Sequence, residues 1–289
     1  MTGGRVLVLA IRAIGDMVLM TAVIRALHER LKPESLVVLA DGPGAEIFAH
    51  HPHVDRVIRM DRAASRRLPW HARLRESAAL IGRLRAERFT LAVDLFSGPR
   101  SAWLSWASGA LRRIAEDRRA RGRGLLYSDV VRIERNGRHL IEQKLALIEP
   151  LVGAVELKDA TPIIRLTSEE RRAAADRLQR VGLGSGRLAG IIPGGREHHL
   201  WPVERFARVA DHVIQTSGAQ VLLLGGDVDR PVCRDVAAAM RHRCVDLSGQ
   251  TSLRELAALL ERLALVIANE TGPMHLAVAT GQPQVIALY

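Results

Sequence analysis

Short, nearly continuous apolar runs alternate with longer amphipathic stretches along this chain, and the alternation restricts the fold more than any other feature. The runs Arg5–Leu9, Ser35–Ala40 and Leu188–Ile192 are typical of strands buried on both faces. Between the first two, Gly15–Leu31 carries apolar residues at helical spacing. Strands of this kind, separated by helices, indicate parallel sheets that helices cover on both faces. We therefore expect an α/β protein with Rossmann-like sheets.

The pattern starts again after Pro162, so the chain divides into two similar halves. A capped helix is expected to open at Ser168, and strands and helices alternate from there to a last expected strand, Gln284–Leu288. We predict two domains, residues 1–165 and 166–289. Because the sequence stops at a strand, the second sheet is expected to lack its closing helix, so that the domain is either unusually short or truncated.

Two charged segments of the first half receive different interpretations. Leu68–Arg88 is rich in arginine but keeps helical spacing, and we expect a helix there that is interrupted near Pro69. The run Phe89–Asp94 follows as a strand. In contrast, Arg112–Arg123 is polar and shows no apolar period, which predicts a loop.

Basic residues are concentrated in the first half of the chain. The sequence contains 42 lysines and arginines against 31 acidic residues, a formal net charge of +11. Residues 1–150 hold 26 basic and 16 acidic residues, whereas residues 151–289 hold 16 and 15. Such a field attracts an anionic membrane surface, a phosphorylated substrate or nucleic acid. Aromatic residues make up only 3%, which argues against base stacking, so nucleic acid is not an expected partner.

Cysteine usage and hydropathy favour a cytoplasmic protein. Cys233 and Cys244 are too few for a disulfide framework, which favours a reducing compartment. The longest charge-free run, Thr271–Tyr289, is interrupted by prolines and glycine, so no membrane span is expected. Arg12 and Asp16 break the apolar N-terminus early, which argues against a signal peptide.

The first candidate for chemistry is Asp16. It lies where the first expected strand leads into a helix, and open α/β sheets place ligands at this end of their strands. A helix N-terminus also stabilises an ionised carboxylate. The spacing fits a functional carboxylate and a plain helix cap equally well.

The second candidate is the segment Asn269–Ala277, which follows an expected strand and opens a helix. Backbone N–H groups around Thr271 and Gly272 are suited to a phosphate, and the threonine hydroxyl adds a donor. His275 is one turn further on and could donate to a second phosphate oxygen. Glu270 could accept hydrogen bonds from a ribose or orient the loop. The alternative is a capped helix with a surface histidine.

A glycine-rich loop follows the expected strand Leu188–Ile192. Gly194 and Gly195 would let the backbone approach a ligand closely. The alternative is a long loop without a ligand.

Two further patterns are compatible with a metal ion, but other interpretations fit them better. Asp227 and Asp229 form a D-x-D pair, as in metal-dependent glycosyltransferases, but we interpret Asp227 as a turn residue and Asp229 as a helix cap or ribose ligand. His50, His51 and His53 have no carboxylate or cysteine at ligand spacing, which favours a polar loop. We therefore predict no metal ligands.

Taken together, these segments resemble the lipopolysaccharide heptosyltransferase family, glycosyltransferase family 9. The resemblance spans nearly the whole chain and is specific in its order and spacing. It rests on Ile14–Thr21, His51–Asp55, Trp201–Phe206, Gly225–Gly226, Leu247–Leu253 and Glu270–His275.

The resemblance implies a GT-B fold, in which two Rossmann-like domains face each other across a cleft. It also implies transfer with inversion at the anomeric carbon, from an ADP-activated sugar to an anionic lipopolysaccharide inner core. Asp16 matches the family's proposed general base. Residues 1–165 would then bind the acceptor and residues 166–289 the nucleotide sugar. The family continues for several dozen residues beyond Tyr289, so by this comparison the second domain is truncated.

Donor-binding roles follow from the same resemblance. Asp229 matches a carboxylate, usually glutamate, near the donor ribose, and Glu270 stands where the family usually has aspartate. The diphosphate loop is matched by Thr271, Gly272 and His275. Relatives carry a lysine shortly before Trp201, and His199 is at or near its place. His199 cannot hold a full charge at neutral pH unless its pKa is raised.

We therefore expect an inverting glycosyltransferase that moves a sugar, with heptose the first candidate, from a nucleotide diphosphate donor to a lipopolysaccharide core acceptor. No cofactor is obligatory, and Mg²⁺ would at most stimulate. A cytoplasmic protein with peripheral contact to the anionic inner-membrane surface would fit the basic first half. The alternatives are a nucleotide-sugar epimerase or hydrolase on the same fold, and a non-catalytic anion-binding protein.

Overall fold

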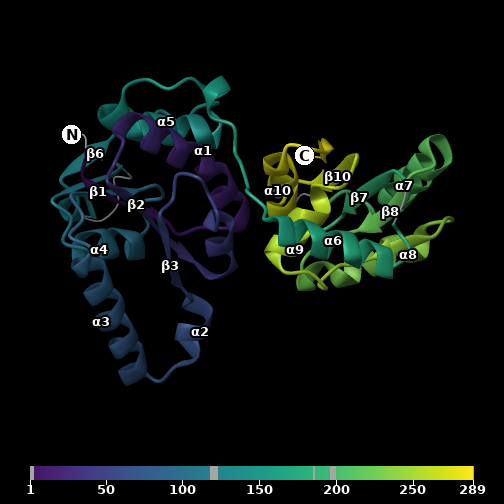
Figure 1. Cartoon of the computed structure of the whole chain (residues 1–289), viewed down its shortest axis with the longest axis horizontal. Coiled ribbons are helices and arrows are strands. Elements are labelled where there is room, and N and C mark those ends of the chain that lie inside the picture. Colours follow the sequence, from purple (N-terminus) through teal and green to yellow (C-terminus); the bar gives the residue numbers. More distant parts are fainter. Residues whose placement is uncertain (1–2, 118–122, 185, 196–199, 289) are drawn as a thin grey trace. The chain divides into compact units, whose positions relative to one another are not determined.

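The computed structural model describes residues 3–117, 123–184, 186–195 and 200–288, which form two compact units. The first unit comprises residues 1–162 and the second residues 163–289, so the division of the chain falls close to the domain boundary expected from the sequence. Each unit contains one wholly parallel sheet with helices packed on it, as the alternating pattern predicts (Figure 1). The two Rossmann-like α/β units agree with the expected fold class.

The sheet of the first unit has the order β3-β2-β1-β4-β5-β6. Its strands are β1 (Arg5–Ala10), β2 (Ser35–Asp41), β3 (Arg56–Met60), β4 (Leu91–Asp94), β5 (Arg112–Glu116) and β6 (Asp129–Val131). The central strand β1 is buried along most of its length, and Val8 pairs with Val38 on one side and Val93 on the other. The order reverses at β1, which makes the carboxyl ends of β1 and β4 the ligand-binding position of such sheets.

Helices cover both faces of this sheet. They are α1 (Ile14–Leu31), α2 (Arg62–Arg67), α3 (Trp70–Ala86), α4 (Pro99–Ala107) and α5 (Leu140–Val152), with 3₁₀ turns at Gly42–Phe48, Arg123–Leu126 and Leu157–Asp159. The helices α1 and α5 pack against each other. On the other face, Leu84 of α3 and Leu104 of α4 share a core with Leu7 and Leu9 of β1. The helices α2 and α3 form a hairpin that extends away from the sheet (Figure 1).

One prediction for the first unit is wrong. The segment expected as a loop, Arg112–Arg123, begins with strand β5, and only its last part, residues 118–122, lies outside the described residues. Ile114 and Ala115 are fully buried. The guanidinium of Arg112 donates to Asp129 on β6 in two hydrogen bonds of 3.0 Å, and Arg113 donates to two backbone carbonyls. Tertiary partners for the arginines thus let a polar sequence form a strand.

The sheet of the second unit has the order β11-β10-β7-β8-β9. Its strands are β7 (Leu188–Ile192), β8 (Gln220–Leu223), β9 (Cys244–Asp246), β10 (Leu265–Asn269) and β11 (Gln284–Leu288). Its helices are α6 (Ser168–Arg180), α7 (Val203–Ser217), α8 (Arg230–Ala239), α9 (Leu253–Leu260) and α10 (Gly272–Thr280), with a 3₁₀ turn at Asp227–Asp229. Phe206 of α7 and Cys233 of α8 pack into one core with Ile191 and Leu223.

An ion pair joins α6 to α9 in the second unit. The carboxylate of Glu170 accepts hydrogen bonds from Arg254 Nε and an Nη, each at 2.7 Å, and also caps the α6 N-terminus at Thr167. Partial burial raises the pKa of Glu170, but the Arg254 bonds and the Thr167 cap outweigh it, and the pKa falls to about 2.

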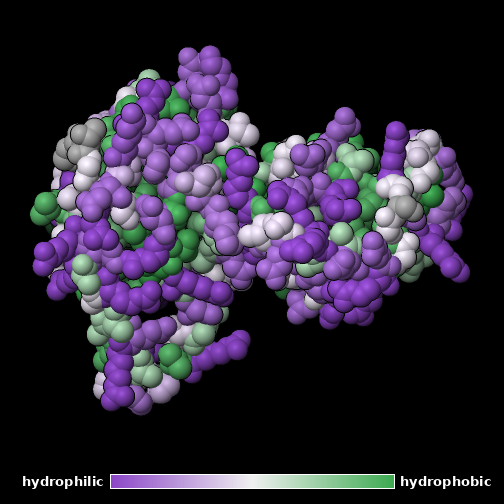
Figure 2. All heavy atoms as spheres, viewed as in Figure 1, coloured by the Kyte–Doolittle hydropathy of each residue, from purple (hydrophilic) through white to green (hydrophobic). Residues whose placement is uncertain are grey.

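The surface of the described residues is mainly hydrophilic in the view of Figure 2, with apolar residues dispersed among charged ones. Within the described ranges, no helix combines the length and the hydropathy that a membrane crossing requires.

Candidate functional site

Three loops of the second unit converge at the carboxyl edge of its sheet. The strands β8, β7 and β10 are neighbours and run parallel, so their carboxyl ends lie side by side. The loop after β7 carries Gly194 and Gly195, the loop after β8 carries Asp229, and the loop after β10 carries Glu270 and Thr271. The structure therefore brings together candidates that are far apart in the sequence, at the edge where open α/β sheets bind ligands.

The two glycines allow these loops to touch. A Cβ placed on Gly194 would lie 2.2 Å from Oδ1 of Asp229, which no real Cβ tolerates. A Cβ on Gly195 would meet Cγ2 of Thr271 at 3.4 Å. The Asp229 carboxylate itself accepts a 2.7 Å hydrogen bond from the Gly226 backbone N–H. Asp229 thus caps the 3₁₀ turn Asp227–Asp229 from within the site, beside the glycine loop.

Asn269 fixes the loop after β7, a role that the sequence motif did not reveal. Its side chain is buried, its amide group donates to the Pro193 carbonyl at 2.8 Å, and its oxygen accepts from the Trp201 N–H at 3.2 Å. These two bonds tie both ends of the glycine-rich loop to β10. An asparagine at the end of an apolar strand was the available signal, since a buried amide needs partners.

The helix α10 begins within the predicted diphosphate loop. Thr271 is its N-cap, and the hydroxyl accepts from the Met274 N–H at 3.4 Å. Gly272 is the first helical residue, and His275 lies in the first turn and is half-buried. Glu270 is exposed. The positive end of the helix dipole therefore lies at Thr271 and Gly272, where it can stabilise an anion.

A fourth loop, after β9, also reaches this edge. The Gly249 N–H donates to the Gly225 carbonyl at 3.0 Å, and Gly249 has a φ of +62°. A Cβ there would meet atoms of Asp227 and Arg230 at 2.7 Å. The sequence resemblance included this segment without giving it a role, and the structure shows that it supports the turn before Asp229.

The structure does not test the predictions on metals and His199, which stay predictions. His199 lies outside the described residues. The ring centroids of His51 and His53 lie 5.8 Å apart in an edge-to-face contact, and those of His28 and His53 lie 4.7 Å apart with the rings tilted. Across the part of the chain that the structure describes, no three His, Cys, Asp or Glu side chains are grouped as metal ligands would be.

In the first unit, Asp16 lies in the first turn of α1, just after β1. It does not cap the helix: Ala13 is the N-cap, without a side-chain bond. The Asp16 side chain is 27% exposed, and its Oδ2 accepts from Arg12 Nε at 2.9 Å. The Arg12 guanidinium in turn lies 6.0 Å above the Phe96 ring. A partly exposed carboxylate oriented by one arginine is thus available at the carboxyl edge of the first sheet.

Buried ionisable side chains support the loops around that edge, and sequence reasoning missed them. Asp94, at the end of β4, accepts from the Tyr127 hydroxyl at 2.6 Å and from the Ser97 N–H at 2.8 Å, yet burial raises its pKa above the usual range. Glu116, at the end of β5, accepts from Lys144 Nζ at 3.0 Å, and both side chains are almost fully buried. An acidic residue at the end of an apolar strand was the signal for Asp94, whereas the polar sequence around Glu116 gave none.

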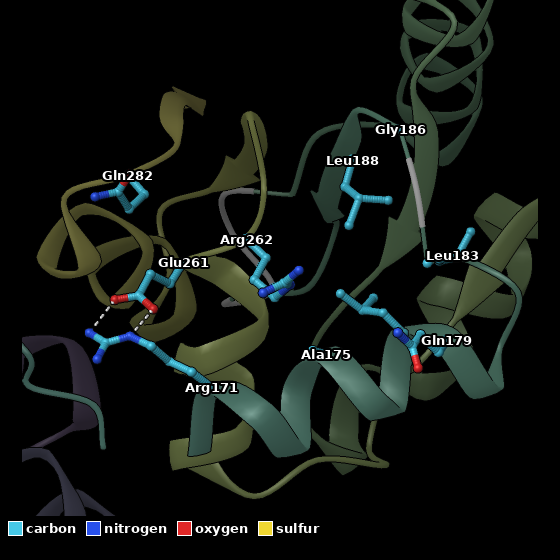
Figure 3. A pocket seen from close by; sticks show the side chains of 11 residues that line it. Arg171, Ala175, Gln179, Leu183, Gly186, Leu188, Glu261, Arg262 and Gln282 are labelled. Carbon is cyan, nitrogen blue, oxygen red and sulfur yellow. Dashed lines mark hydrogen bonds and ion pairs between the residues drawn. The ribbon is translucent and has the colours of Figure 1, made fainter. Parts of the chain in front are cut away.

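The second unit also has a pocket of about 570 Å³ away from these loops (Figure 3). Leu188, the first residue of β7, lines it, so the pocket lies at the amino edge of the sheet. An ion pair between Arg171 and Glu261, with hydrogen bonds of 2.6 and 2.8 Å, stands at one side (Figure 3). None of the predicted donor-binding residues lines it.

Comparison with known proteins gives a consistent result. The family model described as glycosyltransferase family 9 (heptosyltransferase) matches residues 77–289. Lipooligosaccharide heptosyltransferase 2 of Haemophilus influenzae is 27% identical over 221 residues, which cover 72% of this chain and 62% of that protein. This chain thus spans less than two thirds of that relative's length.

Solved structures agree on the fold. A family 9 glycosyltransferase from Veillonella parvula has a TM-score of 0.87 at 23% identity. Its alignment covers all of this chain and 81% of the Veillonella chain. The ADP-heptose lipopolysaccharide heptosyltransferase II of Escherichia coli has a TM-score of 0.81 at 23% identity, covering 99% of this chain and 84% of its own. The expected GT-B class is confirmed, and the chain belongs to glycosyltransferase family 9 (heptosyltransferase).

Proposed function

We propose that this chain transfers a sugar from a nucleotide diphosphate donor to a hydroxyl of an anionic lipopolysaccharide core acceptor, with inversion at the anomeric carbon. The observation that carries the proposal is the convergence of the Gly194, Asp229 and Thr271 loops at one sheet edge. Membership of a glycosyltransferase family supports the reaction class.

The second unit would bind the donor. The N-terminus of α10 at Thr271 and Gly272 suits the diphosphate, and His275 can donate to it from the same turn. Asp229, beside the glycine loop, suits the ribose hydroxyls, and exposed Glu270 is placed to accept from the same donor. The name of the E. coli structure, an ADP-heptose transferase, makes ADP-heptose the first donor to test.

Asp16 would be the general base. The acceptor oxygen forms a bond to the anomeric carbon as the bond from that carbon to the diphosphate oxygen breaks, and the acceptor proton passes to Asp16. Arg12 donates to Oδ2 of Asp16, which would orient the carboxylate and leave Oδ1 to accept the proton. The diphosphate leaves with the negative charge, which the α10 N-terminus and His275 stabilise.

We further propose that no metal is obligatory, with Mg²⁺ at most stimulating, because helix N-terminus and His275 supply donors to the leaving group. The acceptor would be anionic and attached to the inner membrane, on its cytoplasmic face. The 26 basic against 16 acidic residues within 1–150 favour such an acceptor. Nucleic acid is not a proposed partner.

The test compares Asp16→Asn with Asp176→Asn, an exposed acid on α6. Asp16→Asn should lower kcat by about two to four powers of ten and leave the Kd for ADP unchanged. Asp176→Asn should change neither. Unreduced turnover in Asp16→Asn would reject the base, and sugar release from donor alone would favour an epimerase or hydrolase instead.

A further inference from the structure

The hairpin of α2 and α3 exposes large apolar side chains at its tip. Leu68 and Pro69 form the connection between the two helices. Leu68 is 42% exposed, Trp70 72% and Leu74 60%. Trp70 and Leu74 are four residues apart on α3 and therefore share one face of the helix. Trp70 is the most exposed of the four tryptophans in the chain.

Arginines surround these apolar side chains. Residues 62–86 contain seven arginines and one acidic residue, Glu76. Arg66, Arg67, Arg73 and Arg75 are exposed, and none of them makes an ion pair with another described residue. In Figure 2 the hairpin shows hydrophilic and hydrophobic residues intermixed. The tip thus combines cationic charge with apolar surface that nothing in its own unit covers.

The base of the hairpin, by contrast, is firmly attached to the first unit. Arg62 opens α2 and is held by the carboxylate of Asp41 at the end of β2. At the other end, Leu84 is fully buried, and Arg85 Nε donates to the Ala107 carbonyl at 3.0 Å. The exposed tip is therefore held in a defined position on a fixed base.

The hairpin also begins at the sheet edge that carries Asp16. The strands β1 and β3 are parallel members of one sheet, so their carboxyl ends lie at the same edge. Asp16 follows β1, and Asp61, the N-cap of α2, follows β3. A surface bound by the tip would thus lie on the Asp16 side of the first unit.

We propose that this hairpin docks the protein on an anionic phospholipid surface. Leu68, Trp70 and Leu74 enter the headgroup region, where tryptophan is favoured, and the arginines contact lipid phosphates. The docking of the hairpin on lipid does not depend on the proposed function. Only the identity of the acceptor that docking would bring close rests on it. Nucleic acid would engage the arginines but would gain little from two exposed leucines. The aromatic rings at the tip are Trp70 and the neighbouring His71, set edge to face, and they do not form a stacking series.

The test measures co-sedimentation of the full chain with two kinds of vesicle, phosphatidylcholine alone and an equal mixture with phosphatidylglycerol. Binding is expected only to the mixed vesicles and should weaken with salt. Arg66→Gln with Arg67→Gln should weaken binding about fivefold for each charge removed. Trp70→Ser with Leu74→Ser should abolish most of the remaining salt-resistant binding.

Matched controls separate the hairpin from general surface effects. Arg208→Gln with Arg234→Gln removes two exposed arginines from the second unit, and Trp106→Ser removes a half-exposed tryptophan from α4. Both controls should bind the mixed vesicles as the unaltered chain does. Equal losses in control and hairpin variants, binding to duplex DNA in place of vesicles, or a dimer that Trp70→Ser dissolves would overturn the proposal.

The proposal fails independently of the proposed function. Hairpin variants should keep the Kd for ADP and turnover with a detergent-free, lipid-trimmed acceptor, and lose activity only on acceptor presented in vesicles. Vesicle binding without any sugar transfer would reject the transfer reaction and support the docking surface. Sugar transfer without vesicle binding would reject the docking surface and support the transfer reaction.

Discussion

Replacing Gly194 with alanine tests the contact on which the donor site depends. The new Cβ would lie 2.2 Å from Oδ1 and 2.3 Å from Cγ of Asp229. The φ of Gly194 is not in the left-handed region, so the backbone accepts alanine and only the contact is at issue. Asp229 must retreat by roughly 1 Å to reach ordinary van der Waals distance.

The expected loss of stability follows from the contacts that this displacement of Asp229 breaks. Overpacking of this kind costs about 1 to 3 kcal/mol, and loss of the 2.7 Å bond from the Gly226 N–H adds about 1 kcal/mol. We therefore expect Gly194→Ala to lower the free energy of unfolding by about 2 to 4 kcal/mol. The displaced carboxylate should also weaken ADP binding.

A double-mutant cycle isolates the contact. Asp229→Gly removes the three atoms nearest to the new Cβ, so Gly194→Ala should cost much less in that background, measured by urea unfolding. Gly226→Ala is the matched control, because its Cβ would lie 3.6 Å from the same carboxylate. Additive costs in the cycle, or equal effects of Gly194→Ala and Gly226→Ala, would refute the reasoning.

Two further predictions concern buried and partly buried charges. Lys144→Met removes the cation paired with buried Glu116 and should lower the free energy of unfolding in urea by about 3 kcal/mol, although Arg135 also contacts that carboxylate. The double variant Lys144→Met with Glu116→Met should recover much of this loss. The pKa of Glu170 is lowered from 4.5 to about 2, so its pair with Arg254 contributes stability above pH 4.5 that is lost as the pH falls towards 2. Glu170→Gln should therefore lower the free energy of unfolding at pH 7 by about 1 to 2 kcal/mol, less than the full pKa shift implies because solvent screens the pair. The melting temperature of this variant should also depend less on pH between 4.5 and 2 than that of the unaltered chain.

Periodicity alone predicted most of the elements because their apolar residues face one core. Leu188–Ile192 and Gln284–Leu288 have the predicted bounds. The errors occur where tertiary contacts override local pattern. The arginines of β5 find partners on β6 and in loops, and Cys244–Asp246 is too short a strand to show any period.

The candidate site was predictable in its residue types and less so in its contacts. Glycines and a capped helix after apolar runs marked the Gly194 and Thr271 loops. That Asp229 would touch Gly194 depends on β7 and β8 being neighbours, which the sequence does not state. The role of Asn269 likewise depends on the strand order, since it reaches the loop after β7 from β10.

The two sheet edges hold their loops by different physical means, and this difference determines how each should respond to change. In the second unit, space is made by the missing side chains of Gly194 and Gly195, so steric substitutions should dominate there. In the first unit, the loops after β4 and β5 are held by buried Asp94 and by Glu116 with Lys144. Buried charges are costly when one partner is removed but are screened little by salt. Salt should therefore weaken binding of an anionic acceptor or membrane to the exposed arginines long before it loosens the framework around Asp16.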